Sequence, residues 1–238
     1  MLIAPPIDLF VSADLHVSRP PRVTSYVTRL RFLVCLLALP PGAFADAGLD
    51  RMLKGIEGHY NRAKTLQVLF TEEYTAEGRS RRPESGLLVL RKPGRMRWDY
   101  TAPAGKLFIS DGKTVYLYSP DAHRVERAPL KASEDMRAPL AFLLGKLDFS
   151  REFKDFQAHP EGADTLVTAF ANSDKLPYGK VEMLVSPSFE IHRLVVTGTD
   201  QSILTFTFAG EKVNPKVDDA TFRFHMPPGA ILADAEDR

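Results

Sequence analysis

The sequence has little cysteine, no excess of charge of one sign and no long apolar run. Cys35 is the only cysteine among 238 residues, so a disulfide within the chain is excluded. The formal net charge is +1, and no cluster of basic residues suggests a nucleic-acid partner. The apolar run Phe32–Leu39 is shorter than the roughly 20 residues that a helix needs to cross a bilayer. Hydrophobic residues make up 44% of the sequence, which is enough for a globular core.

Motifs for catalysis and for cofactors are missing as well. We find no G-x-S-x-G elbow, no phosphate loop and no dinucleotide fingerprint. Glu72 and Glu73 are adjacent on an expected strand, so they point to opposite faces and cannot pair as acid and base. The histidines after residue 45 have no metal-ligand spacing: His59, His123, His159, His192 and His225. We therefore expect a binding protein rather than an enzyme, with no catalytic residue, no metal site and no cofactor.

The N-terminal region predicts an exported protein. Arg29 and Arg31 precede the apolar run, and Ala43-Phe44-Ala45 follows it, as in a secretory signal peptide. We expect residues 1–45 to be a leader and signal peptide, cleaved after Ala45, and residues 46–238 to form a single periplasmic domain. The alternative is that the apolar run is a buried core segment.

Two further features of this region are its polar start and its cysteine. A polar, proline-containing leader is unusual before a signal peptide, so we expect translation to start near Val23 or Val27. Cys35 follows Val34, whereas a lipidation signal needs a small residue before the cysteine, so lipidation is not expected.

The pattern after residue 45 predicts an α+β fold that is mainly antiparallel. Asp46 is the expected N-cap of a first helix. That helix has one apolar face: Leu49, Met52, Leu53, Ile56, Tyr60 and Ala63. A second helix is expected from Pro139 to Gly145.

Alternating runs separated by turn residues predict about eleven strands. They are drawn from residues 67–75, 85–90, 95–100, 106–110, 114–118, 123–128, 153–157, 165–171, 180–186, 191–198, 203–209 and 222–225. Successive hairpins without parallel crossovers predict an open, incomplete β-barrel whose concave face is covered by the helices.

Five segments resemble the LolA family of outer-membrane lipoprotein carriers, and they occur in the order of that family. They are TLQVLFT at 65–71, GLLVLRKPGRMRW at 86–98, SDGKTVYLYSP at 110–120, APLAFLL at 138–144 and ATFRFHMPPG at 220–229. The resemblance implies a periplasmic carrier that binds the acyl chains of lipoproteins in an apolar cavity and moves them from the inner to the outer membrane. It implies an inner-membrane ABC transporter as donor and an outer-membrane receptor lipoprotein as acceptor. We expect the carrier to be a monomer.

The resemblance also places a lipid-binding cavity under a lid helix. The residues expected to line the cavity are Met96, Trp98, Phe108, Leu140, Leu143 and Leu144. Ordinary core packing uses the same residue types and remains an equal alternative for each of them.

Two positions depart from the family pattern. Its Arg-Pro pair, whose arginine helps to hold the lid closed, is matched by Lys92-Pro93, so Lys92 or the preceding Arg91 is the expected latch. Glu72 stands where the family often has glutamine.

Other functions remain open at this point. A receptor lipoprotein or an envelope-stress sensor has a similar sheet. The receptor would need a lipidated cysteine where Asp46 stands, and the sensor would need a second domain. A lipid hydrolase would need a nucleophile beside a base, and the sequence offers no such pair.

Overall fold

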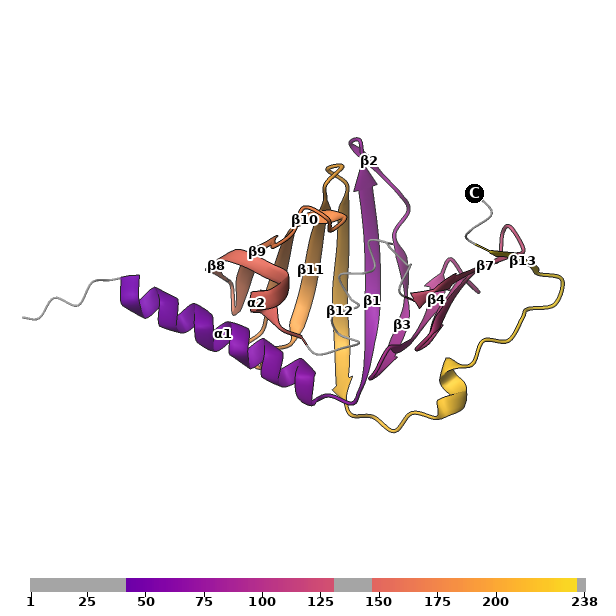
Figure 1. The fold of residues 1–238 in the computed structure, drawn as a ribbon, viewed down its shortest axis with the longest axis horizontal. Coiled ribbons are helices and arrows are strands. Elements are labelled where there is room, and N and C mark those ends of the chain that lie inside the picture. Colours follow the sequence, from indigo (N-terminus) through magenta and orange to yellow (C-terminus); the bar gives the residue numbers. More distant parts are fainter. Residues whose placement is uncertain (1–41, 131–146, 235–238) are drawn as a thin grey trace, which may run out of the picture. The chain divides into compact units, whose positions relative to one another are not determined.

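The fold of the described chain is one 13-stranded sheet with few helices (Figure 1). A computed structural model describes residues 42–130 and 147–234. The helices are α1 (Gly42–Arg62), α2 (Phe149–Glu152) and the 3-10 helix η3 (Asp219–Phe222). The strands in the first half are β1 (Thr65–Ala76), β2 (Arg79–Ser80), β3 (Glu84–Arg91), β4 (Arg95–Ala102), β5 (Leu107–Asp111), β6 (Thr114–Ser119) and β7 (Arg124–Pro129). Those in the second half are β8 (Phe153–Glu161), β9 (Asp164–Ala171), β10 (Tyr178–Val185), β11 (Ile191–Gly198), β12 (Ile203–Val213) and β13 (Ile231–Asp234).

The strand order makes the sheet an open barrel. It runs β13-β7-β6-β5-β4-β3-β1-β12-β11-β10-β9-β8, with the short β2 paired to β1. The two end strands, β13 and β8, do not meet in this order, so the barrel is incomplete, as the sequence predicts. Neighbours pair antiparallel except β13, which runs parallel to β7. The ladder between β1 and β12 joins the two halves of the sheet, for example at Phe70↔Phe208.

Two sequence expectations about local structure are wrong. Residues 222–225 do not form a strand. Asp219–Phe222 is a 3-10 helix, because the Asp218 carboxylate accepts a hydrogen bond from the N–H of Ala220 and caps it. Phe224 then stacks on Tyr116, with ring centroids 4.5 Å apart. Helix α1 begins at Gly42, so Asp46 lies within it and is not its N-cap.

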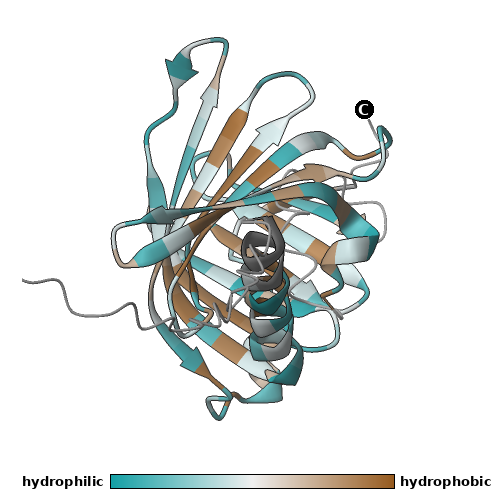
Figure 2. Cartoon of the chain, turned by 90° about the vertical axis from the view of Figure 1, so that its left-hand side faces the viewer, coloured by the Kyte–Doolittle hydropathy of each residue, from teal (hydrophilic) through white to brown (hydrophobic). Residues whose placement is uncertain are grey.

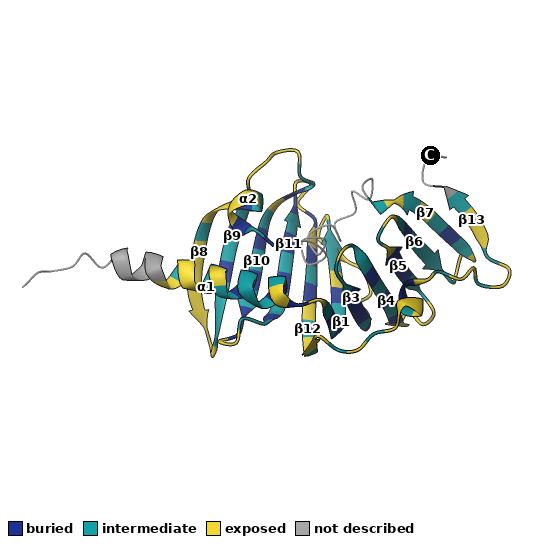
Figure 3. Ribbon diagram, turned by 60° about the horizontal axis from the view of Figure 1, so that its bottom comes forward, coloured by how far each residue is buried: buried dark blue, intermediate teal, exposed yellow. Residues whose placement is uncertain are grey.

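The main core cluster lies on one face of the sheet, which we call the inner face. Because side chains alternate along a strand, Val68 and Phe70 of β1 face the same way as Trp98 of β4 and Phe206 of β12. Figure 2 shows apolar patches between polar ones along the strands of the sheet, and Figure 3 shows that buried positions alternate with more exposed ones. Ile56 and Tyr60 of α1 join the same buried cluster, so α1 packs on the inner face. Met52 and Leu53 pack against this cluster, so the expected apolar helix face is confirmed from Met52 to Tyr60.

A bulge in β12 changes which face its last residues occupy. The pairing with β1 shifts between Gln67 and Leu69, opposite Gly210, whose φ is +63°. Glycine adopts this conformation without the steric cost that a Cβ brings. The shift turns Glu211 toward the inner face, where the carboxylate reaches α1.

None of the helices in the described ranges combines the length and apolarity of a membrane span.

Candidate functional site

The centre of the inner face is aromatic. The Trp98 side chain is fully buried, and its ring lies edge-on to Phe70 at 4.7 Å and tilted to Phe206 at 5.6 Å. Its indole N–H donates to the Met96 sulfur over 3.4 Å, because the two residues are two apart on β4 and share a face. Phe108 pairs with Trp98 across the β4–β5 ladder and is also buried. The structure therefore brings Met96, Trp98 and Phe108 together, and their role as lipid contacts stays a prediction.

One acidic side chain lies among these rings. Glu72 is only 8% exposed, and its carboxylate accepts a hydrogen bond from the Tyr100 hydroxyl at 3.2 Å. Tyr100 in turn contacts Phe70 edge-on at 5.1 Å. Glu73 is exposed on the other face, so the expectation that the two adjacent glutamates diverge is confirmed.

The end of α1 is bound to the sheet by a buried polar network. The Tyr60 hydroxyl donates to Glu211 at 3.0 Å and accepts from the backbone N–H of Ile191 at 2.8 Å. The other carboxylate oxygen of Glu211 lies 2.7 Å from Nε2 of His59. Burial, followed by the negative charge of Glu211, raises the pKa of Tyr60 well above its ordinary value. These contacts fix the position of α1 over β11 and β12.

Helix α1 also holds the start of α2. The side chain of Asn61 donates to the carbonyl of Leu147 at 2.8 Å and accepts from the N–H of Leu147 at 2.7 Å. Glu57 accepts the N–H of Phe149 at 2.8 Å. Because Leu147 and Phe149 are both buried, this stretch closes part of the inner face under α1.

The two expected latch residues lie on different faces. The Nζ of Lys92 donates to the carbonyl of Tyr60 at 2.9 Å, at the C-terminal end of α1, and burial lowers the pKa of Lys92. Arg91 points to the outer face, where it binds Asp219 and the carbonyl of Val217. The expected lid helix, with Leu140, Leu143 and Leu144, lies outside the described residues.

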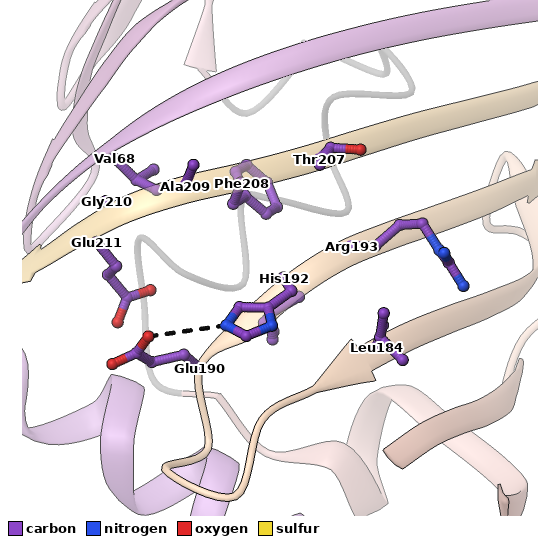
Figure 4. A pocket seen from close by; sticks show the side chains of 11 residues that line it. Val68, Leu184, Glu190, His192, Arg193, Thr207, Phe208, Ala209, Gly210 and Glu211 are labelled. Atoms are coloured by element: carbon purple, nitrogen blue, oxygen red, sulfur yellow. Dashed lines mark ion pairs between the residues drawn. The ribbon is translucent and has the colours of Figure 1, made fainter. Parts of the chain in front are cut away.

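A pocket of about 460 Å³ lies where β11 and β12 separate (Figure 4). Their ladder runs only from Arg193↔Thr207 to Thr197↔Ile203, so Ile191 and Phe208 lie beyond it. The wall includes inner-face positions such as Val68 and charged side chains such as Glu190 and Arg193.

In the described ranges, no three His, Cys, Asp or Glu side chains gather as ligands for a metal ion.

Sequence reasoning missed the network around Tyr60 and Glu211. The sequence predicts Tyr60 only as part of an apolar helix face, and it predicts no role for Glu211. The signal was an isolated glycine, Gly210, within a strand pattern, which indicates a bulge that turns the following side chain.

An open, mainly antiparallel barrel whose apolar inner face is partly covered by a helix defines the class of this protein. Residues 61–225 match the family described as "Outer membrane lipoprotein carrier protein LolA". The chain belongs to this family.

Relatives support the match over most of the chain. An outer-membrane lipoprotein carrier protein of Chromobacterium violaceum is 28% identical over 202 residues, which is 84% of this chain and 92% of the relative. One of Proteus mirabilis is 27% identical over 204 residues, covering 84% and 96%. The crystal structure of a LolA superfamily protein from Nitrosomonas europaea is similar with a TM-score of 0.43 at 10% identity, covering 74% of this chain and 97% of that one.

Proposed function

We propose that this protein is a periplasmic carrier of lipoproteins, and that it is not an enzyme. The observation that carries the proposal is the family match over residues 61–225. In this proposal residues 1–45 are the leader and signal peptide, and residues 46–238 are the exported carrier domain. The donor is an inner-membrane ABC transporter and the acceptor is an outer-membrane receptor lipoprotein.

The acyl chains occupy the apolar interior in this proposal. Each buried CH₂ group contributes about 0.8 kcal/mol, so lipid chains require an extensive apolar surface. The aromatic inner face around Trp98 supports this, as does the helix that partly covers it. Met96 and Phe108 contact the chains beside Trp98, and Leu140, Leu143 and Leu144 close over them. Lys92 or Arg91 holds the closed state.

Binding can be tested directly because Trp98 is the only tryptophan. A triacylated lipopeptide with brominated chains should quench its fluorescence, since bromine quenches on contact. The same peptide with unbrominated chains controls for conformational change. If the lipopeptide binds but its bromine does not quench the fluorescence, Trp98 is not part of the binding site. Absence of binding would overturn the proposal.

Transport needs a separate test. Donor membranes carrying a radiolabelled lipoprotein are mixed with the purified carrier and with acceptor vesicles bearing the receptor. The carrier should release the lipoprotein from the first and deliver it to the second.

N-terminal sequencing of the protein from periplasm should begin at Asp46, and a mature chain that keeps residues 30–39 would disprove export by cleavage.

A further inference from the structure

A hairpin presents three arginines at one end of the sheet. Strands β1 and β2 pair at Thr75↔Ser80 and Ala76↔Arg79. The turn between them is formed by Glu77 and Gly78, which both have positive φ, as in the tight turns that suit a two-residue hairpin. The hydroxyls of Thr75 and Ser80 lie 2.9 Å apart and close the pair. Figure 1 shows this hairpin extending past the end of β3.

The arginines of this hairpin are exposed, and no acid within the described part of the chain pairs with them. Arg79, Arg81 and Arg82 are all exposed, and among the described residues none of them forms an ion pair. Glu77 is the only acid from residue 77 to residue 83, so the tip carries a net charge of +2 from three cations and one anion. Glu84, the next acid along the chain, is already bound to Lys106. The strand tip is also hydrophilic in Figure 2.

The arginines border the end of the apolar inner face. The Arg81 guanidinium lies over the Tyr74 ring at 4.4 Å, and the Arg81 N–H donates to the carbonyl of Tyr74 at 2.9 Å. Tyr74 packs against the buried cluster, so Arg81 lies directly at its edge. Ile203, which is 41% exposed, pairs with Thr75 across the ladder to β12. Leu204, which pairs with Tyr74, is buried on the inner face, so the adjacent Ile203 points to the outer face. This end of the sheet thus carries cations and an aromatic ring on its inner face and an exposed aliphatic side chain on its outer face.

We propose that this hairpin is a docking site for an anionic lipid bilayer, in which Arg79, Arg81 and Arg82 bind lipid phosphates. A guanidinium presents a planar fork that matches phosphate oxygens in a bidentate manner. The hairpin is a projecting tip and not a groove, so it fits a surface that repeats the same anion more readily than one folded partner. Ile203 and the Tyr74 ring would lie at the level of the headgroups. Attraction by three cations is weak and reversible, which permits the protein to leave the membrane again.

The test is the partition of the cargo-free protein onto vesicles. Vesicles of phosphatidylcholine alone are compared with vesicles containing phosphatidylglycerol, at low and at high salt. Wild type should bind only the anionic vesicles, and binding should fall at high salt. Each arginine near such a surface is worth about a fivefold change in partition, so Arg79→Gln/Arg81→Gln/Arg82→Gln should reduce it about 100-fold. Arg79→Gln/Arg82→Gln, which keeps the contact with Tyr74, should reduce it about 25-fold.

A matched variant removes the same charge elsewhere. Arg51, Lys154 and Arg223 are exposed and lie outside the hairpin, so changing all three to glutamine should leave most of the binding. Equal losses in the two triple variants would show that net charge acts alone, and this would overturn the proposal. Wild type that fails to bind anionic vesicles would overturn it too, as would hairpin-dependent cross-linking to an acidic protein without vesicle binding. Acyl chains are not needed here, so the result is independent of the Trp98 quenching experiment.

Discussion

At the scale of single residues, Tyr60 connects helix and sheet through one hydroxyl. It satisfies the backbone N–H of Ile191, which lies beyond the ladder with β12, and it donates to Glu211. A buried polar group that loses its partner costs more than an exposed one, because water does not replace the bond.

Tyr60→Phe should therefore destabilise the fold although it keeps the ring. We expect a loss of about 1–3 kcal/mol in the free energy of unfolding, measured by urea denaturation at neutral pH. Tyr116→Phe is the control, because the ring stacked on Phe224 is retained. Its effect should stay within about 0.5 kcal/mol. Equal losses in the two variants would show that the Tyr60 hydroxyl has no special role.

The buried tyrosines Tyr60 and Tyr178 also make the stability of the folded protein depend on alkaline pH. Burial raises the pKa of Tyr178 to about 12 from 10.0, and it raises the pKa of Tyr60 as well. Above pH 10 the unfolded chain releases these protons while the folded chain keeps them, so stability falls as pH rises toward 12. Lys92, with its lowered pKa, acts in the opposite direction.

Tyr178→Phe isolates one contribution, because Lys92 is the same in both proteins. Its unfolding free energy should fall less steeply than that of wild type between pH 10 and pH 11. Urea denaturation at pH 8, 10 and 11 measures both slopes. Parallel slopes would mean that the folded protein does not hold the Tyr178 proton.

The two latch candidates should differ in what they affect. Lys92 contacts the end of α1, where a cation also interacts favourably with the helix dipole. Lys92→Leu should keep the fold, cost about 1 kcal/mol and slow delivery of cargo, whereas Lys92→Arg should be milder. Arg91→Leu should lower thermal stability, because it frees the segment around Asp219. If both leucine variants transfer cargo at the normal rate, neither Lys92 nor Arg91 is the latch.

At the scale of elements, the docking of α1 depends on a close contact at Gly55. A Cβ there would lie 2.2 Å from the ring of Phe189, which packs against the core cluster. The helix can approach the loop between β10 and β11 only because this position has no side chain.

Gly55→Ala should loosen α1, although alanine is the better helix former. We expect a loss of about 1–3 kcal/mol, as for an overpacked core. Gly58→Ala is the matched control, since its Cβ would meet only the flexible end of Arg62 at 3.3 Å. That change should be neutral or stabilise by up to about 1 kcal/mol. Thermal melts compare the two, and a Gly55→Ala protein as stable as Gly58→Ala would refute the close contact.

At the scale of the whole described domain, one sheet supplies both the scaffold and the apolar interior. The β1–β12 ladder joins segments distant in sequence, and the inner face is continuous across it from Trp98 to Phe206. A ligand held there would contact both halves of the sheet and would therefore stabilise the folded state.

Lipid binding should consequently raise the stability of the protein. At a lipopeptide concentration 100 times the dissociation constant, the unfolding free energy should increase by about 2.7 kcal/mol. The deacylated peptide should have no effect. A melting temperature that rises equally with both peptides would place the interaction on the peptide and not on the acyl chains.

The sequence by itself determined the fold class and most of its elements. Alternation gave the strands around Trp98, and the three- and four-residue spacing gave the helix face of Ile56 and Tyr60. These periodicities are local and follow directly from backbone geometry. They also placed Met96 and Trp98 on one face and separated Glu72 from Glu73.

Only the tertiary structure decided the contacts between distant segments. The sequence predicts a strand at 222–225, but the structure has a capped 3-10 helix that ends at Phe222 and a Phe224 ring stacked on Tyr116. Packing on the sheet outweighed the alternating pattern of this segment. The pairing of Tyr60 with Glu211 depends on the bulge at Gly210 and on residues about 150 positions apart. Lys92 and Arg91 point to opposite faces of the sheet, because they are adjacent residues at the end of β3. Periodicity shows which face a residue occupies, whereas the partner on that face is set by how the chain folds back on itself.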